Sequence, residues 1–109
     1  MNGVPTVPVA DVPADAPLLD VREPDEWAAG HAPGAHHVPM MEVPARLADV
    51  PADADIVVVC RSGGRSAQVT AYLQQHGWEN VRNLTGGMGA WQDAGRELVS
   101  EDGRPARVL

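Results

Sequence analysis

The residues with the clearest chemical potential lie in the segment CRSGGR, from Cys60 to Arg65. Cys60 is the only cysteine of the chain. Gly63 and Gly64 let successive backbone N–H groups turn inward and form a concave nest for an anion. Arg61 and Arg65 add positive charge and fork-shaped donors that suit sulfonate, phosphate or carboxylate oxygens. The segment therefore predicts a site that holds a nucleophilic sulfur beside an oxyanion.

The surroundings predicted for Cys60 favour the thiolate over the thiol. A helix that starts just after this segment offers unpaired N–H groups and the positive end of its dipole. Such surroundings, with arginines nearby, lower a cysteine pKa from about 8.5 to roughly 3.5–7.5. The alternative is a buried, inert cysteine before an ordinary glycine turn. Two arginines and two glycines inside six residues favour the reactive interpretation.

A strand before Cys60 and a helix after it would position the segment. Residues 55–59 contain the apolar, β-branched run IVVV, which is typical of a buried strand in a parallel sheet. Residues 64–76 suit a helix that stops at Gly77. Ligands of open α/β sheets bind just beyond the carboxyl ends of the strands, and Cys60 stands at such a point.

The rest of the chain alternates between short strands and short helices. This alternation predicts a parallel sheet with helices on both faces. A first strand at 4–9 would lie at a sheet edge because it contains Pro5 and Pro8. Residues 51–53 would be a loop. The other expected strands are 18–21, 35–38 and 80–84, and the other expected helices are 24–29, 42–48, with Leu47 facing inward, and 89–94.

Length and charge narrow the classes of protein to consider. The 109 residues fit one domain, with a core from about 4 to 100 and a polar tail at 101–109 that we expect to fray. A formal net charge of −7 argues against nucleic acid and anionic membranes as partners. No apolar run could span a bilayer, and no signal peptide is visible. One cysteine cannot form an internal disulfide, so we expect a reduced, cytoplasmic location.

Three segments carry a resemblance to a known family. They are LLDVREPDEWAAGHAPGAHHVP at 18–39, VVVCRSGGRSAQVTAYLQQHGW at 57–78 and NLTGGMGAW at 83–91, and they are similar in order and spacing to the rhodanese domain. The resemblance implies an α/β fold with a five-stranded parallel sheet flanked by helices on both faces. It also implies a sulfurtransferase without a cofactor, whose loop cysteine takes a sulfane sulfur from thiosulfate or a similar donor. The resulting persulfide passes the sulfur to a thiol or to cyanide.

The second segment implies the reacting groups. Cys60 resembles the sulfur-accepting nucleophile, and Ser66 matches the first helical residue after the loop. Four residues separate Cys60 from Arg65, whereas phosphatases and arsenate reductases of the same fold have one residue more. The shorter loop suits the sulfur of a persulfide. The loop that would cradle the persulfide and bind the anionic donor comprises Arg61, Ser62, Gly63, Gly64 and Arg65.

The first segment implies supporting residues that brace the site. They belong to two signatures of the family, with one departure at Ala32, where a larger aliphatic residue is usual. That departure affects local packing and not the chemistry. The supporting residues are Asp20, Arg22 and Glu23 in one signature and His31, Pro33 and Gly34 in the other.

Other residue types have simpler interpretations. The histidines are spread over a turn, a strand and a helix end, so we expect no metal site. Asp25, Glu26 and the other acids should be solvated, and the three tryptophans should anchor the core. Met40 and Met41 suit either the core or an apolar rim of the pocket. The histidines in question are His31, His36, His37 and His76.

The residues leave two main function classes open. The first is a thiosulfate sulfurtransferase with an anionic donor and a thiol acceptor, such as a thioredoxin-like protein. The second is a carrier or binding module that holds a persulfide for a dedicated protein partner. A phosphatase or arsenate reductase is a distant third. Small members of the family imply a monomer.

Overall fold

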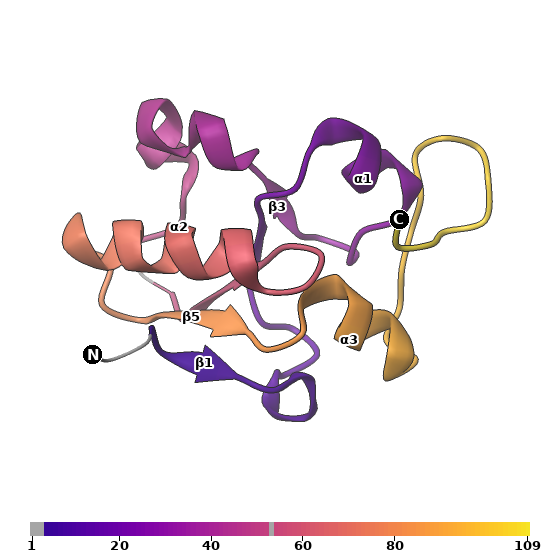
Figure 1. Ribbon diagram of the computed structural model, residues 1–109, viewed down its shortest axis with the longest axis horizontal. Coiled ribbons are helices and arrows are strands. Elements are labelled where there is room, and N and C mark those ends of the chain that lie inside the picture. The colour runs from indigo at the N-terminus through magenta and orange to yellow at the C-terminus, as the bar shows by residue number, and fades with distance from the viewer. Residues whose placement is uncertain (1–3, 53) are drawn as a thin grey trace.

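The computed structural model describes residues 4–52 and 54–109, so Asp53 of the expected loop lies outside the described residues. In this part of the chain, parallel strands form one sheet in the order β1-β5-β4-β2-β3 (Figure 1). This confirms the predicted α/β fold. The strands are β1 (Thr6–Val7), β2 (Leu18–Asp20), β3 (His36–His37), β4 (Ile56–Val59) and β5 (Val81–Leu84).

The central strand β4 explains the unbroken apolar run in the sequence. It pairs with β2 on one side and β5 on the other, so both of its hydrogen-bonding edges are satisfied inside the sheet. Ile56 and Val58 pack into the core on one face of the sheet, and Val57 and Val59 pack into the core on the other. All four side chains are buried.

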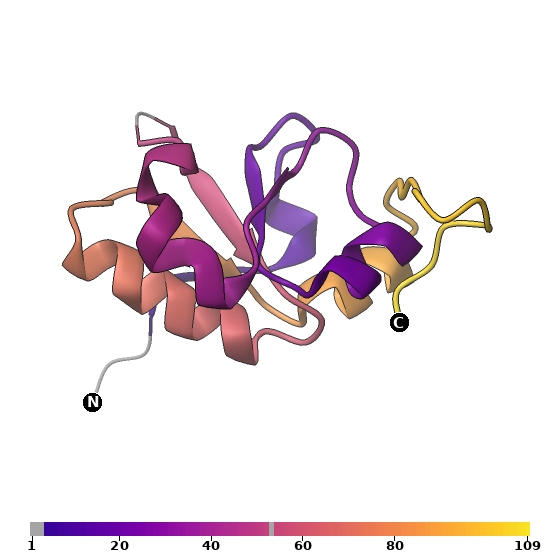
Figure 2. The same cartoon turned by 90° about the horizontal axis from the view of Figure 1, so that it is seen from above.

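Helical segments cover the sheet on both faces (Figures 1 and 2). The helix α2 (Gly64–Gln75) and the 3₁₀ segment η2 (Met40–Asp49) enclose one half of the core. The helix α3 (Gly87–Asp93) and the short η1 (Val9–Asp11) enclose the other half. The helix α1 (Pro24–Ala29) follows the carboxyl end of β2, on the side of the sheet where the loop after β4 lies.

The segment expected as a helix at 42–48 is a kinked 3₁₀ segment instead. Pro44 lies inside it and has no backbone N–H to donate, and Arg46 has non-helical dihedral angles. Val43 is fully buried against the core, while Leu47 is only partly buried there. No helix in the described residues is long and apolar enough to cross a membrane.

The prediction that the tail at 101–109 frays was wrong. The chain forms a β-bridge between His31 and Val99, then folds back over the end of α1, and Val108 packs against the core. The N–H groups of Glu101 and Arg107 donate to the carbonyls of Ala28 and Ala29, at 2.8 and 2.9 Å. These carbonyls belong to the last turn of α1, where a helix offers no N–H groups to carbonyl oxygens. The N–H groups of the tail take that place.

Candidate active site

The thiol of Cys60 lies in the loop between β4 and α2, as predicted. Cys60 follows the buried end of β4 and is itself 1% exposed. Gly63 adopts a left-handed conformation with φ of 114°, which a residue with a side chain rarely takes. That conformation lets the N–H of Gly63 donate to Cys60 Sγ at 3.1 Å. The nest predicted from the two glycines therefore faces the sulfur.

A side chain from α2 completes the contacts of the sulfur. The resemblance implied that Ser66 is the first residue of the helix. The helix begins at Gly64 instead, so Ser66 is its third residue. Ser66 is fully buried, and its Oγ lies 3.3 Å from Cys60 Sγ. Thr70, one turn later, donates to the Ser66 carbonyl and holds this part of the helix in place.

Two opposing effects act on the pKa of Cys60. Burial raises it, because the charged thiolate loses solvent. Hydrogen bonds from the Ser66 hydroxyl and from the backbone N–H groups of Ser66, Gly63 and Ser62 lower it, and they outweigh burial. The pKa of Cys60 therefore lies below its ordinary value of 9.0. The direction is the one predicted, and the N–H groups expected at the start of the helix contribute to it. Hydrogen bonds are the main causes that lower the pKa, and the charge of Arg65 interacts with Cys60 as well.

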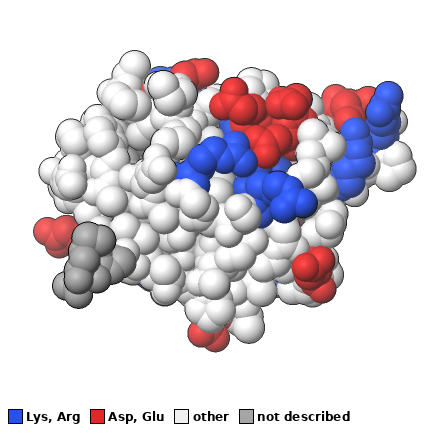
Figure 3. Space-filling model, in the orientation of Figure 1, with Lys and Arg blue, Asp and Glu red and all other residues white. Residues whose placement is uncertain are grey.

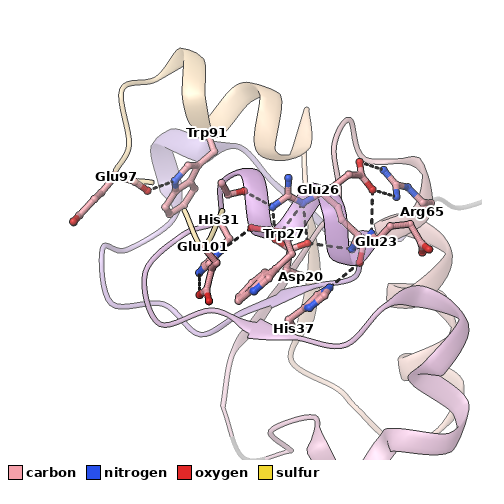
Figure 4. Close-up of polar contacts among 12 residues, drawn as sticks. Asp20, Glu23, Glu26, Trp27, His31, His37, Arg65, Trp91, Glu97 and Glu101 are labelled. Carbon is pink, nitrogen blue, oxygen red and sulfur yellow. Dashed lines mark hydrogen bonds and ion pairs between the residues drawn. The ribbon is translucent and has the colours of Figure 1, made fainter. Parts of the chain in front are cut away.

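Arg65 is paired with a residue that the sequence analysis treated as solvated. Its Nη1 and Nη2 donate to Glu26 Oε1 and Oε2 at 2.7 and 3.0 Å, a bidentate pair between α2 and α1 (Figure 4). The Glu26 side chain is only 15% exposed, so the prediction of a solvated Glu26 was wrong. The hydrogen bond from Arg65 holds the pKa of Glu26 below its usual value of 4.5.

A local signal for Glu26 was present in the sequence. Glu23 and Glu26 have the spacing of a capping box, and the structure contains that box at the start of α1. The backbone N–H of Glu23 donates to Glu26 Oε1 at 3.0 Å. The capping box fixes the carboxylate that receives Arg65, and this gives Glu23 a place in the support of the site.

Arg61 bonds a segment that is distant in sequence. It is exposed, and its Nε donates to the main-chain oxygen of Leu109 at 2.6 Å. Both arginines that the resemblance assigned to an anionic donor therefore have partners within the chain. Figure 3 shows that basic and acidic side chains lie side by side on this face of the molecule.

The pair Asp20 and Arg22 lies at the carboxyl end of β2, the strand that pairs with β4. Arg22 Nε and Nη2 donate to the Asp20 carboxylate at 2.9 and 2.8 Å, and both side chains are fully buried. Arg22 Nη2 also donates to the carbonyl of Gly30 at 2.7 Å. The pair thus joins the end of β2 to the end of α1.

The ring of Trp27 lies between two histidine rings (Figure 4). It stacks on His31 with centroids 3.5 Å apart and on His37 with centroids 4.6 Å apart. His31 also bonds the Trp27 carbonyl and lies 3.4 Å from Glu101 of the tail. These contacts organise α1 and the tail. In the described part of the chain, no group of three or more His, Cys, Asp or Glu residues could hold a metal.

The start of α3 fixes the backbone of the Cys60 loop. The N–H groups of Met88 and Gly89 donate to the carbonyls of Cys60 and Arg61, at 2.7 and 3.0 Å. A Cβ on Gly87 would lie 2.4 Å from the Cys60 carbonyl oxygen, so only glycine fits there. No site role was expected for these residues from the sequence, although the run GGMG was a visible signal of close backbone approach.

Asn83 of β5 is a further residue of the site for which no role was expected from the sequence. It is 6% exposed, and its Nδ2 donates to the Gly63 carbonyl at 3.1 Å. Its Oδ1 lies 2.5 Å from Ser66 Oγ. Asn83 stands two positions after the buried Val81 on the same strand, so it points to the same face of the sheet. A polar residue at such a buried position was the only local signal of its role.

Met40 and Met41 line an apolar groove between η2 and α2. Its volume is about 280 Å³, and Cys60 is not part of its lining. Met41 is 83% exposed, while Met40 packs partly against the core. The other residues that line the groove are Val43, Pro44, Gln68, Val69 and Tyr72.

Comparison with known proteins agrees with this geometry. The chain is 45% identical over 89 residues to a sulfurtransferase of Allochromatium vinosum. The matched stretch covers 82% of this chain and 83% of the relative. It is 36% identical over 77 residues to the thiosulfate sulfurtransferase GlpE of Pseudomonas aeruginosa, covering 71% and 70% of the two chains. These names support the general sulfurtransferase class.

The fold comparison points the same way. The crystal structure of a rhodanese-related protein from Thermoplasma volcanium matches with a TM-score of 0.82 at 30% identity, over 87% of this chain and 97% of the other. The family model of the rhodanese-like domain matches residues 9–94. The chain therefore belongs to the rhodanese-like domain family.

Proposed function

We propose that the chain is a sulfurtransferase that uses Cys60 to move a sulfane sulfur from thiosulfate, or a similar anionic donor, to a thiol or cyanide acceptor. The single observation that carries this proposal is the position of Cys60 Sγ. It lies within hydrogen-bond reach of Gly63 N–H and the Ser66 hydroxyl, which lower its pKa. The names of the relatives support the same class.

The proposed reaction has two steps. The Cys60 thiolate attacks the outer sulfur of thiosulfate, the sulfur–sulfur bond of the donor breaks, and sulfite leaves with the electron pair. Cys60 then carries a persulfide whose outer sulfur is negative. A thiolate or cyanide attacks that sulfur, and Cys60 leaves as a thiolate again. The backbone N–H groups of the loop favour a negative sulfur at both stages.

The size of the loop supports a sulfur atom rather than a phosphate ester as the group it holds. Four residues lie between Cys60 and Arg65, and Gly63 N–H already contacts Sγ at 3.1 Å. A tetrahedral oxyanion would need a wider ring of donors. We therefore expect sulfur transfer to exceed hydrolysis of a phosphate ester such as p-nitrophenyl phosphate.

One observation favours the second candidate, a persulfide carrier for a protein partner. Arg65 is bonded to Glu26 and Arg61 to the Leu109 oxygen, so a free anionic donor must compete for both. A carrier would instead accept sulfur from a protein persulfide and pass it to a thiol protein, for example a thioredoxin-like one. Slow turnover of thiosulfate with rapid persulfide loading by a cysteine desulfurase would favour the carrier.

The test of the proposed function replaces the nucleophile and then moves it. Cys60→Ser should abolish thiocyanate formation from thiosulfate and cyanide, because a hydroxyl is a far weaker nucleophile and cannot hold a sulfane sulfur. The control is Cys60→Ser with Ser62→Cys, which keeps a thiol in the loop but places it on an exposed residue. Circular dichroism checks the fold of both. Turnover by either folded variant at the wild-type rate would remove Cys60 from the mechanism.

A further inference from the structure

Three side chains from different elements form a short chain of polar contacts that ends at the nucleophile. Cys60 Sγ lies 3.3 Å from Ser66 Oγ, and Ser66 Oγ lies 2.5 Å from Asn83 Oδ1. All three residues are buried. The Ser66 hydroxyl is therefore in reach of two acceptors, a sulfur from the loop and an amide oxygen from β5.

The orientation of the Asn83 amide is fixed by its other contact. Its Nδ2 donates to the Gly63 carbonyl at 3.1 Å, and a carbonyl can only accept. The oxygen of the amide must therefore face Ser66, where it can only accept. Ser66 has one hydroxyl hydrogen, so it can donate to Asn83 or to Cys60 but not to both.

The count of protons differs between the two states of Cys60. In the thiol state, the S–H can donate to Ser66 Oγ while Ser66 donates to Asn83 Oδ1, and every acceptor has a donor. In the thiolate state, one hydrogen remains for two acceptors. If Ser66 turns to the sulfur, the buried Asn83 Oδ1 faces an oxygen lone pair without a donor, and this arrangement is costly.

We propose that Asn83 is a positioning residue that controls the ionisation of Cys60 by competing with the sulfur for the hydroxyl proton of Ser66. By this account β5 limits how reactive the thiol becomes, while the loop N–H groups promote its ionisation. The proposal rests on the proposed function only in taking Cys60 as the nucleophile. Its test uses alkylation of Cys60, which needs a reactive thiol but does not depend on sulfur transfer. This proposal and the proposed function can therefore fail separately.

Other charges also face this part of the molecule. Arg65 of α2 is close enough to Cys60 for their charges to interact, and its charge is opposed by Glu26 of α1 and by Glu23 just before α1. The buried pair of Asp20 and Arg22 lies at the end of β2, the strand beside β4. These groups, with Arg61 in the loop, are unchanged by a substitution at Asn83. The side chains that α3 contributes in its first turn are uncharged.

The experiment measures the rate of alkylation by iodoacetamide against pH. Asn83→Leu has a similar shape and no acceptor, so it should free the Ser66 hydroxyl for the thiolate and lower the apparent pKa. Since one hydrogen bond to an ion changes an equilibrium about tenfold, alkylation below the pKa should rise by about that factor. Asn83→Asp is the matched opposite: its charge and acceptors should raise the apparent pKa and slow the reaction.

A second background separates this effect from damage to the loop. In Ser66→Ala there is no hydroxyl to share, so adding Asn83→Leu should leave the apparent pKa of that variant unchanged. An equal shift in both backgrounds, or no fall of the pKa in Asn83→Leu alone, would overturn the proposal. If thermal melting shows that Asn83→Leu does not fold, the smaller Asn83→Ala carries the same expectations.

Discussion

Arg65 and Glu26 show how one pair of residues can serve both stability and the site. The pair joins the first turn of α2 to the first turn of α1, so it fixes the start of the helix that carries Ser66. It also brings a carboxylate to the arginine whose charge interacts with Cys60, which reduces the positive field at the sulfur. Hydrogen bonds, rather than a free arginine charge, are thus left as the main stabilisation of the thiolate.

Glu26→Gln tests this pair. The variant should lower the free energy of unfolding at neutral pH by about 1 kcal/mol, as expected for a partly exposed ion pair. Because the pKa of Glu26 is lowered in the folded state, its contribution is complete above the unfolded value of 4.5 and is lost as the pH falls through the folded value. Urea unfolding of wild type and variant at several pH values measures the difference.

The difference between the two proteins should therefore shrink in acid. The control is Asp25→Asn, which removes an exposed acid from the same helix. It should change the unfolding free energy by less than Glu26→Gln at neutral pH. A Glu26→Gln effect of constant size from neutral to strongly acidic pH would contradict the role assigned to the ion pair.

At the scale of elements, α1 is held in place by Arg22, just before it in sequence, and by two distant segments, the tail and the start of α2. The tail bonds its last carbonyls, Arg22 bonds the carbonyl of Gly30, and Arg65 bonds Glu26. Gly30 lies where the tail crosses, and a Cβ there would be 2.2 Å from the Arg107 carbonyl oxygen. The tail can therefore dock in this way only because position 30 is a glycine, which has no side chain.

Gly30→Ala should destabilise the protein because backbone atoms of the tail must move to admit the methyl group. The expected loss is about 1–3 kcal/mol, as for other overpacked sites. Thermal unfolding measures the loss, and hydrogen exchange should show reduced protection at 99–109. The control is Gly64→Ala, whose Cβ would meet nothing within 4 Å. Unchanged protection of the tail in Gly30→Ala would show that the close approach does not matter.

Elements whose cause is local could be predicted from the sequence. The run Ile56–Val59 predicted β4 because a central strand buries both faces, and Gly63 predicted the nest because the turn needs a left-handed residue. The edge strands β1 and β3 are shorter than predicted; Thr6–Val7 lies between Pro5 and Pro8, which have no N–H to donate to a ladder. Pro44 explains why η2 is not a regular α-helix.

Contacts between distant segments could not be predicted in the same way. Glu26 meets Arg65 across 39 positions, and Arg61 meets Leu109 across 48. Their pairing depends on how α1, α2 and the tail pack, which no local pattern encodes. Asn83 is similar, because its partners on the loop and on α2 become neighbours only when β5 pairs with β4.

At the scale of the whole molecule, the charge that a distant anion meets is negative. The chain has 15 acidic and eight basic residues, a net charge of −7. Among the residues that the structure describes, four arginines form ion pairs with acids, so much of the positive charge is neutralised locally; they are Arg22, Arg46, Arg65 and Arg107. An anionic donor such as thiosulfate must therefore approach against the net field of the protein.

Ionic strength should reveal this repulsion if thiosulfate is a donor. The Debye length falls from about 30 Å at 0.01 M to about 10 Å at 0.1 M, and the radius of gyration is 12.8 Å. Salt should thus screen the distant acids while the contacts within the loop persist. We expect kcat/KM for thiosulfate to rise roughly two- to fivefold over that range. Alkylation of Cys60 by neutral iodoacetamide, the control, should change little. A fall of kcat/KM with salt would mean that the loop arginines govern the approach of the donor.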